Sequence, residues 1–323
     1  MAYSQLTTTQ RYTISAMRKQ KKSQSEIAET IGVHPSTISR ELRRNGLPHL
    51  YQPVHAQAKA RSRCARPQLF QPSDWEPLVK PLREKQWSPE QIIGRLKLEG
   101  KENLPSVETF YQHIYADKKR GGDLWKHLRR KRKKRRKRLT KKDLRGTIPN
   151  RVGIEKRPVE IETKANIGHW EGDTVVGAGH KQAIVTVVER HSKYLVAAKV
   201  EQATAENVGQ TIVRLLKPHA QNVKTITYDN GKEFCQHEKI SQKLEAQAYF
   251  AQPYHSWERG LNEHTNGLLR QYFPKKTPFE TLTQEEITAA VLKINQRPRK
   301  VLGYLTPEEV FFSGKEKPEI HSD

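Results

Sequence analysis

The stretch GHWEGDTVVG at residues 168–177 begins the part of the sequence that decides the fold. Its β-branched residues predict a strand, and two more β-rich runs follow it, AIVTVVER at 183–190 and YLVAAKV at 194–200. Short polar turns separate the three runs. Because consecutive strands with short connections usually pair, we predict a three-strand meander with Asp173 in its first strand.

After the meander the sequence alternates between helical and strand patterns. Helices and strands are predicted in turn at residues 203–216, 224–229, 239–246 and 247–253. A last helix is expected to begin near residues 260–262. Three strands, helix, strand, helix, strand, helix is the order of a ribonuclease H-like, integrase-type fold. We therefore expect an α/β catalytic domain of this class over residues 161–315.

Three acidic residues occupy matching places in this order, namely Asp173, Asp229 in TITYDNGKEF, and Glu263 in WERGLNEHTNGLLRQYFPK. The first and fourth strands are neighbours in the expected sheet, so both aspartates can reach one space. Glu263 follows Asp229 after 33 intervening residues and shares a helix face with Arg270, seven positions on. Converging carboxylates repel one another without a cation, and their hard oxygen ligands suit Mg²⁺ or Mn²⁺, with two ions expected. Arg270 is expected to hold a DNA phosphate.

Each of the three acids has an ordinary structural explanation when it is taken alone. Asp229, for example, begins an Asp-Asn-Gly turn, and Glu263 fits an exposed helix position. All three in the required topological places make coincidence a poor explanation. Glu258 is the main rival for the third acid, with Glu171 and Glu233 as weaker rivals. Glu263 is preferred because Glu258 is expected to lie before the helix.

Residues 8–46 predict three short helices. Ala28 is small where two helices must cross closely, Gly32 can adopt a left-handed turn, and Ile38 points back into the core. This spacing predicts a helix-turn-helix DNA-binding domain over residues 1–50, whose last helix lies in the DNA major groove. The positions facing outward, which we expect to contact DNA, are Ser36, Thr37, Ser39, Arg40 and Arg43. A three-helix bundle without DNA contact is the alternative.

Other helical and basic segments lie between these two domains. Residues 51–75 are predicted to be a linker, and residues 76–118 a second helical module of helix-turn-helix type that begins a helix at Ser88. The alternative for this module is a helical hairpin that packs on a neighbouring domain. Residues 119–160 are predicted to be a strongly basic linker, and 316–323 a tail. The expected fold class is therefore multidomain, with all-α modules before the α/β domain.

Positive charge dominates the composition. The formal net charge is +24, and 13 of the 17 residues at 126–142 are Lys or Arg. We expect a polyanionic partner, double-stranded DNA, bound in part through this basic run. The N-terminus shows no signal-peptide pattern and no run approaches about 18 apolar residues, so we expect a soluble cytosolic protein without membrane contact.

Several long motifs carry a family resemblance: GHWEGDTVVG, DNGKEF, QPYHSWERGLNEHTNGLLRQYFPK and INQRPRKVLGYLTPEEVF. With the N-terminal helices they cover most of the chain, which resembles DDE transposases of bacterial insertion sequences, of the insertion-sequence-thirty family. The resemblance implies that Asp173, Asp229 and Glu263 are the metal-binding catalytic triad. It also implies that the N-terminal region binds terminal inverted repeats, and that a strand cut by water gives a 3′-hydroxyl that attacks another phosphodiester.

Two other functions fit parts of the sequence. One is a sequence-specific repressor with an inactive catalytic domain, and the other is a nuclease that cuts without joining. Recombination needs two element ends held together, so we expect a homodimer or a higher oligomer on DNA. In the last motif, Asn295, Arg297 and Arg299 are expected to form a helix end and turn that close the catalytic domain, with the arginines near DNA.

Overall fold

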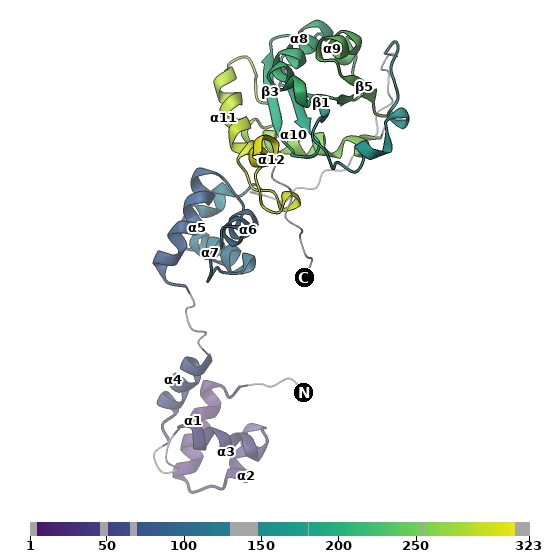
Figure 1. Cartoon of the computed structure of the whole chain (residues 1–323). Helices are drawn as coiled ribbons and strands as arrows, with labels where there is room; N and C mark the ends of the chain where they lie inside the picture. The colour runs from purple at the N-terminus through teal and green to yellow at the C-terminus, as the bar shows by residue number, and fades with distance from the viewer. Residues whose placement is uncertain are drawn as a thin grey trace. The chain divides into compact units, whose positions relative to one another are not determined.

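The computed structural model describes residues 5–45, 51–64, 70–129, 148–179, 181–252 and 255–313, except for the side chains of Cys64, Ser256 and Trp257. The chain divides into two compact units, Met1–Gln71 and Pro72–Asp323 (Figure 1). Most of the predicted basic run, from residue 130 on, and the predicted tail at 316–323 lie outside the described residues. Within the described ranges, every helix is too short or too polar to cross a membrane.

The first unit contains the predicted helix-turn-helix arrangement. Its helices are α1 (Thr8–Lys19), α2 (Gln24–Ile31), α3 (Pro35–Asn45) and α4 (Pro53–Cys64). Ser23 caps α2 in a capping box with Glu26, and Gly32 ends α2 in the left-handed conformation at φ 69°. Ala28 and Ile38 are buried together in the core, as their spacing predicts.

The segment after α3 differs from the linker predicted at residues 51–75. Helix α4 packs on α1 and α3, and Tyr51 and Ala56 join the buried core of the unit. The Tyr51 hydroxyl donates to Glu41 Oε1 at 3.1 Å, and Glu41 is itself paired with the buried Arg11 at 2.8 Å. Few apolar residues mark α4 in the sequence, so its composition resembles that of a linker although it completes the domain.

The second unit begins with a separate group of helices, α5 (Pro72–Glu84), α6 (Pro89–Leu98) and α7 (Val107–Lys119). Helix α5 begins at Pro72, inside the segment predicted as linker, and buries Leu78 and Leu82 against Phe110 and other residues of a small core. Ser88 caps α6 in a capping box with Gln91, as its motif predicts.

A five-stranded sheet forms the centre of the catalytic domain. Its strands are β1 (His169–Val176), β2 (Ala183–Glu189), β3 (Leu195–Val200), β4 (Thr225–Tyr228) and β5 (Gln247–Phe250). Their order is β3-β2-β1-β4-β5, with antiparallel pairs among β1, β2 and β3 and parallel pairs from β1 through β4 to β5. This confirms the predicted meander and the ribonuclease H-like class.

Helices cover both faces of the sheet (Figure 1). They are α8 (Ala205–Leu216), α9 (His237–Leu244), α10 (Gly260–Tyr272), α11 (Gln284–Asn295) and α12 (Pro307–Ser313). Apolar residues of α8 and α9 pack in one core with Trp170, whereas α10 and α11 pack with Val175 in the other. Since side chains alternate along a strand, Asp173 lies on the same face as Val175, towards α10.

Residues before β1 also belong to the catalytic domain, although they fall inside the predicted linker at 119–160. Two short 3₁₀ helices, Ile154–Lys156 and Val159–Ile161, lie here, and Ile148 and Ile161 are buried. The carbonyl of Val152 accepts a hydrogen bond from the Phe250 amide at 2.9 Å, which extends the sheet edge beyond β5. The domain therefore begins earlier than residue 161.

The α5–α7 module contacts the catalytic domain through α6. Arg95 forms two hydrogen bonds with Glu309, of 2.7 and 2.8 Å, and a Cβ added at Gly94 would overlap the ring of Tyr304. The α5–α7 module thus packs on the catalytic domain, which agrees with the alternative prediction of a helical hairpin packed on a neighbouring domain. Whether this module also contacts DNA stays a prediction. Helix α11 ends at Asn295, as predicted, and the Asn295 side chain bonds both the amide and the carbonyl of Leu195.

Candidate active site

Asp173 lies in the middle of β1, with its side chain partly buried beneath α10. Its Oδ1 accepts a 2.8 Å hydrogen bond from the Thr174 amide, and its Oδ2 accepts a 2.8 Å hydrogen bond from Asn266 Nδ2. Only 20% of the side chain is exposed. The carboxylate is therefore held in one orientation by the strand that carries it and the helix that covers it.

Asp229 directly follows β4, the parallel neighbour of β1. Glu171 pairs with Thr227 in the register of these strands, so Asp173 and Asp229 come level two residues later, on the same side of the sheet. The Asp229 Oδ1 accepts from the Gly231 amide at 2.9 Å, which forms the turn that its Asp-Asn-Gly sequence predicts. The two aspartates therefore lie together on neighbouring central strands, near the carboxyl end of β4, as the topology predicts.

Arg259 links the two aspartates. Its Nη1 lies 3.9 Å from Asp173 Oδ2, and its Nη2 lies 3.5 Å from Asp229 Oδ2. Nη1 also donates to the Gly172 carbonyl at 3.0 Å, so the guanidinium is fixed to β1. A positive charge thus already lies between two carboxylates that would otherwise repel each other. The sequence analysis gave this residue no role.

The surroundings of Asp173 favour its protonated form. Burial raises the pKa of Asp173 from an ordinary value of 3.8 to about 6; Arg259 opposes this rise, and the charges of Asp229 and Glu233 add to it. A carboxyl group with a pKa so far above its usual range is typical of functional sites. It also means that a cation bound here would compete with a proton under mildly acidic conditions.

Glu263 lies in the first turn of α10, on an exposed part of the helix. Asn266, which bonds Asp173, follows it by three positions and therefore lies on the same helix face. Nevertheless, nowhere in the described ranges do three His, Cys, Asp or Glu side chains stand in a metal-ligating group. The structure brings together the two aspartates but does not add Glu263 to them, so its place in the triad stays a prediction.

The rivals for the third acid have structural partners. Glu258 lies before α10, as predicted. Its carboxylate accepts a hydrogen bond from the Gln252 amide at 2.8 Å and forms a second one with His255 Nδ1 at 3.1 Å. Glu171 is buried, paired with Arg190 at 3.1 Å and bonded to the Asn262 amide at 3.2 Å. Glu233 accepts from Thr174 Oγ1 at 3.0 Å and is the rival whose charge acts on Asp173.

Asn266 is a second residue that the sequence analysis missed. Besides donating to Asp173, it accepts a hydrogen bond from Thr186 Oγ1 at 3.1 Å through its own Oδ1. It lies seven residues after Arg259, nearly two helical turns, and both point towards β1. The signal in the sequence was this spacing, but polar residues at helical spacing are common on exposed faces and did not distinguish these two.

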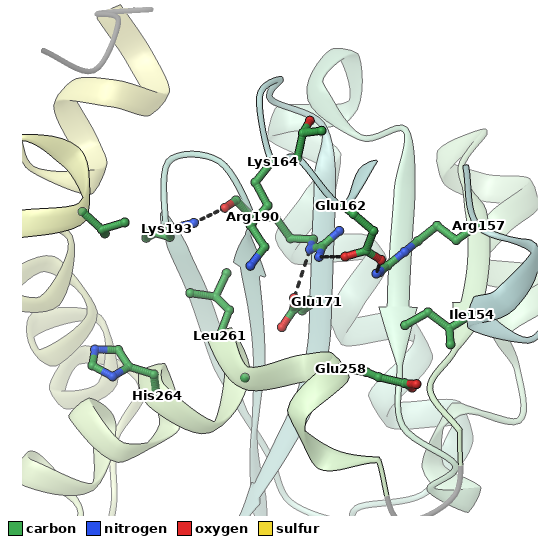
Figure 2. A pocket seen from close by; sticks show the side chains of 13 residues that line it. Ile154, Arg157, Glu162, Lys164, Glu171, Arg190, Lys193, Glu258, Leu261 and His264 are labelled. Carbon is green, nitrogen blue, oxygen red and sulfur yellow. Dashed lines mark hydrogen bonds and ion pairs between the residues drawn. The ribbon is translucent and has the colours of Figure 1, made fainter. Parts of the chain in front are cut away.

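A cavity of about 730 Å³, lined by Glu171 of β1, lies between the start of α10, the segment before β1 and the turn after β2 (Figure 2). Arg157 and Arg190 line it, and both pair with Glu162. Arg190 also pairs with Glu171, as the dashed lines in Figure 2 show. Because each of these arginines has a carboxylate partner, the network holds the cavity wall together with its charges largely balanced.

Arg270 has a structural role in this arrangement. Its Nη2 donates to the Val176 carbonyl at 2.8 Å and its Nη1 to the Phe273 carbonyl at 3.5 Å, so it ties the end of α10 to the end of β1. Burial lowers the pKa of its guanidinium. The phosphate contact expected of Arg270 stays a prediction, and two of its nitrogens, Nη1 and Nη2, already donate to carbonyls of the protein.

The residues expected to contact DNA lie on α3 of the first unit. Ser39, Arg40 and Arg43 are exposed, whereas Ser36 and Thr37 are half-buried. Arg40 Nη2 donates to Ser36 Oγ at 3.0 Å, and this hydroxyl also lies 2.9 Å from His34 Nδ1. The helix therefore presents the exposed basic side chains of Arg40 and Arg43 and several hydroxyls on the face opposite Ile38, and their contact with DNA stays a prediction.

Comparisons with known proteins agree with this architecture. A helix-turn-helix domain family matches residues 2–45, and an integrase core domain family matches residues 163–256. The chain is 45% identical to the transposase for insertion sequence element IS4351 of Bacteroides fragilis, over 95% of both chains. It is 36% identical to the transposase InsI for element IS30A of Escherichia coli, over 97% of this chain and 85% of that one.

A third relative is the transposase for element IS1086 of Cupriavidus metallidurans, 37% identical over 95% of this chain and 94% of the other. Full-length similarity of this kind, together with a DNA-binding domain and an integrase core in the same order, defines both the fold and the class of enzyme, a polynucleotidyl transferase. The chain belongs to the IS30 family of insertion-sequence transposases.

Proposed function

We propose that this enzyme cuts DNA at the ends of an insertion sequence and joins the freed 3′ ends to new DNA, using Asp173, Asp229 and Glu263. The observation that carries the proposal is the pair of aspartates on the neighbouring strands β1 and β4, level in the register of these strands and joined by Arg259. A repressor needs no such pair, whereas a simple nuclease would use it too and is separated from a transposase by the joining reaction.

The donor set fits a hard divalent cation, because it consists of carboxylate oxygens and lies where a positive charge is already accommodated. Asp173, Asp229 and Glu263 would hold Mg²⁺ or Mn²⁺, with two ions expected. When bound, such ions stabilise the charge on the entering and leaving oxygens of a phosphodiester displacement.

The other residues of the site act on the carboxylates. Asn266 orients the Asp173 carboxylate, and the Thr174 amide fixes its second oxygen. Arg259 offsets the repulsion between the two aspartates and favours the ionised form of Asp173. Water, or in the joining step a 3′-hydroxyl, attacks phosphorus, and the bond from phosphorus to the 3′ oxygen on the opposite side breaks in line. The attacking oxygen gives its proton to solvent, and the leaving 3′ oxygen takes one up as a hydroxyl.

We further propose that α3 binds the terminal inverted repeats of the element, with Ser36, Thr37, Ser39, Arg40 and Arg43 on its DNA-facing side. Two ends must be held together for recombination, so the active complex is expected to be a homodimer or larger on double-stranded DNA. Because its substrate is bacterial DNA, the enzyme is expected to act in the cytoplasm at the nucleoid.

One experiment separates the candidate functions. The full chain is incubated with duplex DNA that carries an element end, with Mg²⁺ or with EDTA, and with a pre-cut end that exposes a 3′-hydroxyl. A transposase nicks the intact end and joins the pre-cut end only with Mg²⁺. Binding without cleavage would favour the repressor, and cleavage without joined product would favour the nuclease.

The same DNA tests the role of α3. Arg40→Ala should weaken binding to the element end more than binding to a random duplex of equal length, since base-edge contacts carry the discrimination. Equal loss on both duplexes would show that Arg40 contacts only phosphate.

A further inference from the structure

A second cavity, of about 880 Å³, lies between the α5–α7 module and the catalytic domain. Tyr111 and Tyr115 of α7 line it from the module, and Arg297 and Arg299 line it from the turn after α11. His264, the residue after Glu263, and Val301 line both this cavity and the one lined by Glu171. The two cavities are therefore neighbours along the start of α10.

Arg297 and Arg299 are buried without a carboxylate partner among the described residues. Only 2% of Arg297 and 8% of Arg299 is exposed. Arg297 donates to Gln271 Oε1 at 3.1 Å and to the Tyr272 hydroxyl at 2.9 Å, and Arg299 donates to the Ile294 carbonyl at 3.1 Å. The Nε of each arginine is buried and has no hydrogen-bond partner in this part of the chain. Buried charges are normally paired, so this arrangement is unusual.

The surroundings add positive charge to the cluster. Burial and, after it, the charges of Arg297 and Arg129 together lower the pKa of Arg299 to about 9. The pKa of His264 is likewise lowered by burial and by the charges of Arg129 and Arg299. Among the described residues that line this cavity, Glu90 is the one carboxylate. It forms an ion pair with Lys300 at 3.1 Å, on the exposed rim of the cavity. The cavity wall thus carries several cations that repel one another.

The cavity lined by Glu171 provides the contrast. There, Arg157 and Arg190 are equally buried, but both pair with Glu162, and Arg190 also with Glu171. The described residues supply carboxylate partners to the two buried arginines of the first cavity but not to Arg297 and Arg299 in the second. An external anion could therefore bind at the second cavity. Guanidinium groups suit phosphate because their planar donors match its oxygens.

We propose that Arg297 and Arg299 form a binding site for a phosphate group of the DNA backbone, in the cavity between the α5–α7 module and the catalytic domain. The inference rests on the proposed function for the identity of the anion as DNA. It gives the α5–α7 module a role as the opposite wall of a DNA track, where Tyr115, with 52% of its surface exposed, can stack on a base. It also places a backbone contact next to the helix that carries Glu263.

The test uses inorganic phosphate and the thermal unfolding midpoint of the full chain, without DNA or divalent metal. Phosphate replaces chloride in the low millimolar range at fixed ionic strength. The midpoint of the unmodified chain should rise and then level off, because an anion that binds only the folded state stabilises it. Arg299→Gln should lose more than half of this rise. Arg214→Gln, which removes an exposed positive charge from α8, should keep the whole rise.

The same variant has a second expected signature. Without phosphate, Arg299→Gln should unfold at the same temperature as the unmodified chain or at a higher one, because it removes a buried charge that lacks a carboxylate partner. On DNA, it should reduce the slope of log affinity against log salt by about 0.9 for a duplex contact or about 0.7 for a single strand. The size of the change tells which form of DNA occupies the cavity.

Three results would overturn the proposal: no rise with phosphate in the unmodified chain, an equal rise in Arg299→Gln, or a clearly lower midpoint of Arg299→Gln without phosphate. The last would show that the arginine only supports the fold. Asp173→Asn is expected to respond to phosphate like the unmodified chain, so failure of this site and failure of strand cleavage are separate outcomes.

Discussion

Asn266 donates a hydrogen bond of 2.8 Å from its side-chain amide to Oδ2 of Asp173. The two residues are 93 positions apart, and the bond joins the middle of β1 to the middle of α10. Because Asn266 also accepts from Thr186 of β2, the helix is held over two strands at once. The face of α10 that carries Glu263 is therefore fixed relative to the aspartates.

Replacing Asn266 tests this positioning role. Asn266→Ala should lower the rate of strand cleavage about 10- to 100-fold, the range found when a side chain that orients a metal ligand is removed. The loss should appear in the rate at saturating DNA, with DNA affinity unchanged. Gln210→Ala, which removes an exposed amide that bonds only Glu206 among described residues, is the control and should keep full activity. Normal cleavage by Asn266→Ala would show that Asp173 is oriented without it.

Arg259 should control the pH dependence of cleavage. The pKa of Asp173 is about 6, and Arg259 acts to lower it. Since metal binding needs the ionised carboxylate, activity should fall as pH drops through this region. Arg259→Gln removes the opposing charge, so the acid limb of the pH–rate profile should move to higher pH, whereas Arg259→Lys should move it less. A profile unchanged in Arg259→Gln would contradict the pairing of this residue with the aspartates.

Asp173→Asn should stabilise the metal-free protein above pH 6. The folded-state pKa of about 6 exceeds the ordinary 3.8, so the unfolded chain releases this proton first, and ionisation of Asp173 disfavours the fold. The penalty is absent below pH 4, grows between pH 4 and 6, and is complete above that. Two pKa units correspond to up to about 3 kcal/mol. Denaturant unfolding in EDTA at pH 4 and pH 8 measures it; a gain equal at both pH values would rule out this cause.

The contact between α6 and α12 should contribute to stability. Arg95 and Glu309 form a two-bond ion pair with 19% and 28% of their side chains exposed. A double-mutant cycle with Arg95→Ala and Glu309→Ala should give a coupling energy of about 1–2 kcal/mol. Lys300 and Glu90 form an exposed pair at the same junction and should show no measurable coupling. Equal coupling energies for the two pairs would contradict the expectation that the less exposed pair contributes more to stability.

The sequence predicts the catalytic fold well because its strands are marked by dense apolar runs. β1, β2 and β3 coincide with the runs around Asp173, and the capping box at Ser88 marks a helix start correctly. Helix α4 was assigned to a linker, because its contribution to the core depends on a few residues such as Ala56 whose burial comes from tertiary packing.

The candidate site is predictable in part. Asp173 and Asp229 meet because strand order decides which strand ends are neighbours, and the order follows from the pattern of elements. Arg259 and Asn266 were not found, since their roles depend on the rotation of α10 against β1. Glu263 lies on the predicted helix, in its first turn and with an exposed side chain, and the order of strands does not determine the direction of that side chain.

Joining of a pre-cut element end tests the central proposal most directly, because it requires the complete site but no prior cleavage. The unmodified chain, Asp173→Asn, Asp229→Asn and Glu263→Gln are compared with Mg²⁺ at equal occupancy of the DNA. The account predicts joined product from the unmodified chain and at least a thousandfold loss, about 4 kcal/mol in the barrier, in every variant. Joining at the normal rate by either aspartate variant would contradict it, and joining by Glu263→Gln would transfer the third position to Glu233 or Glu258.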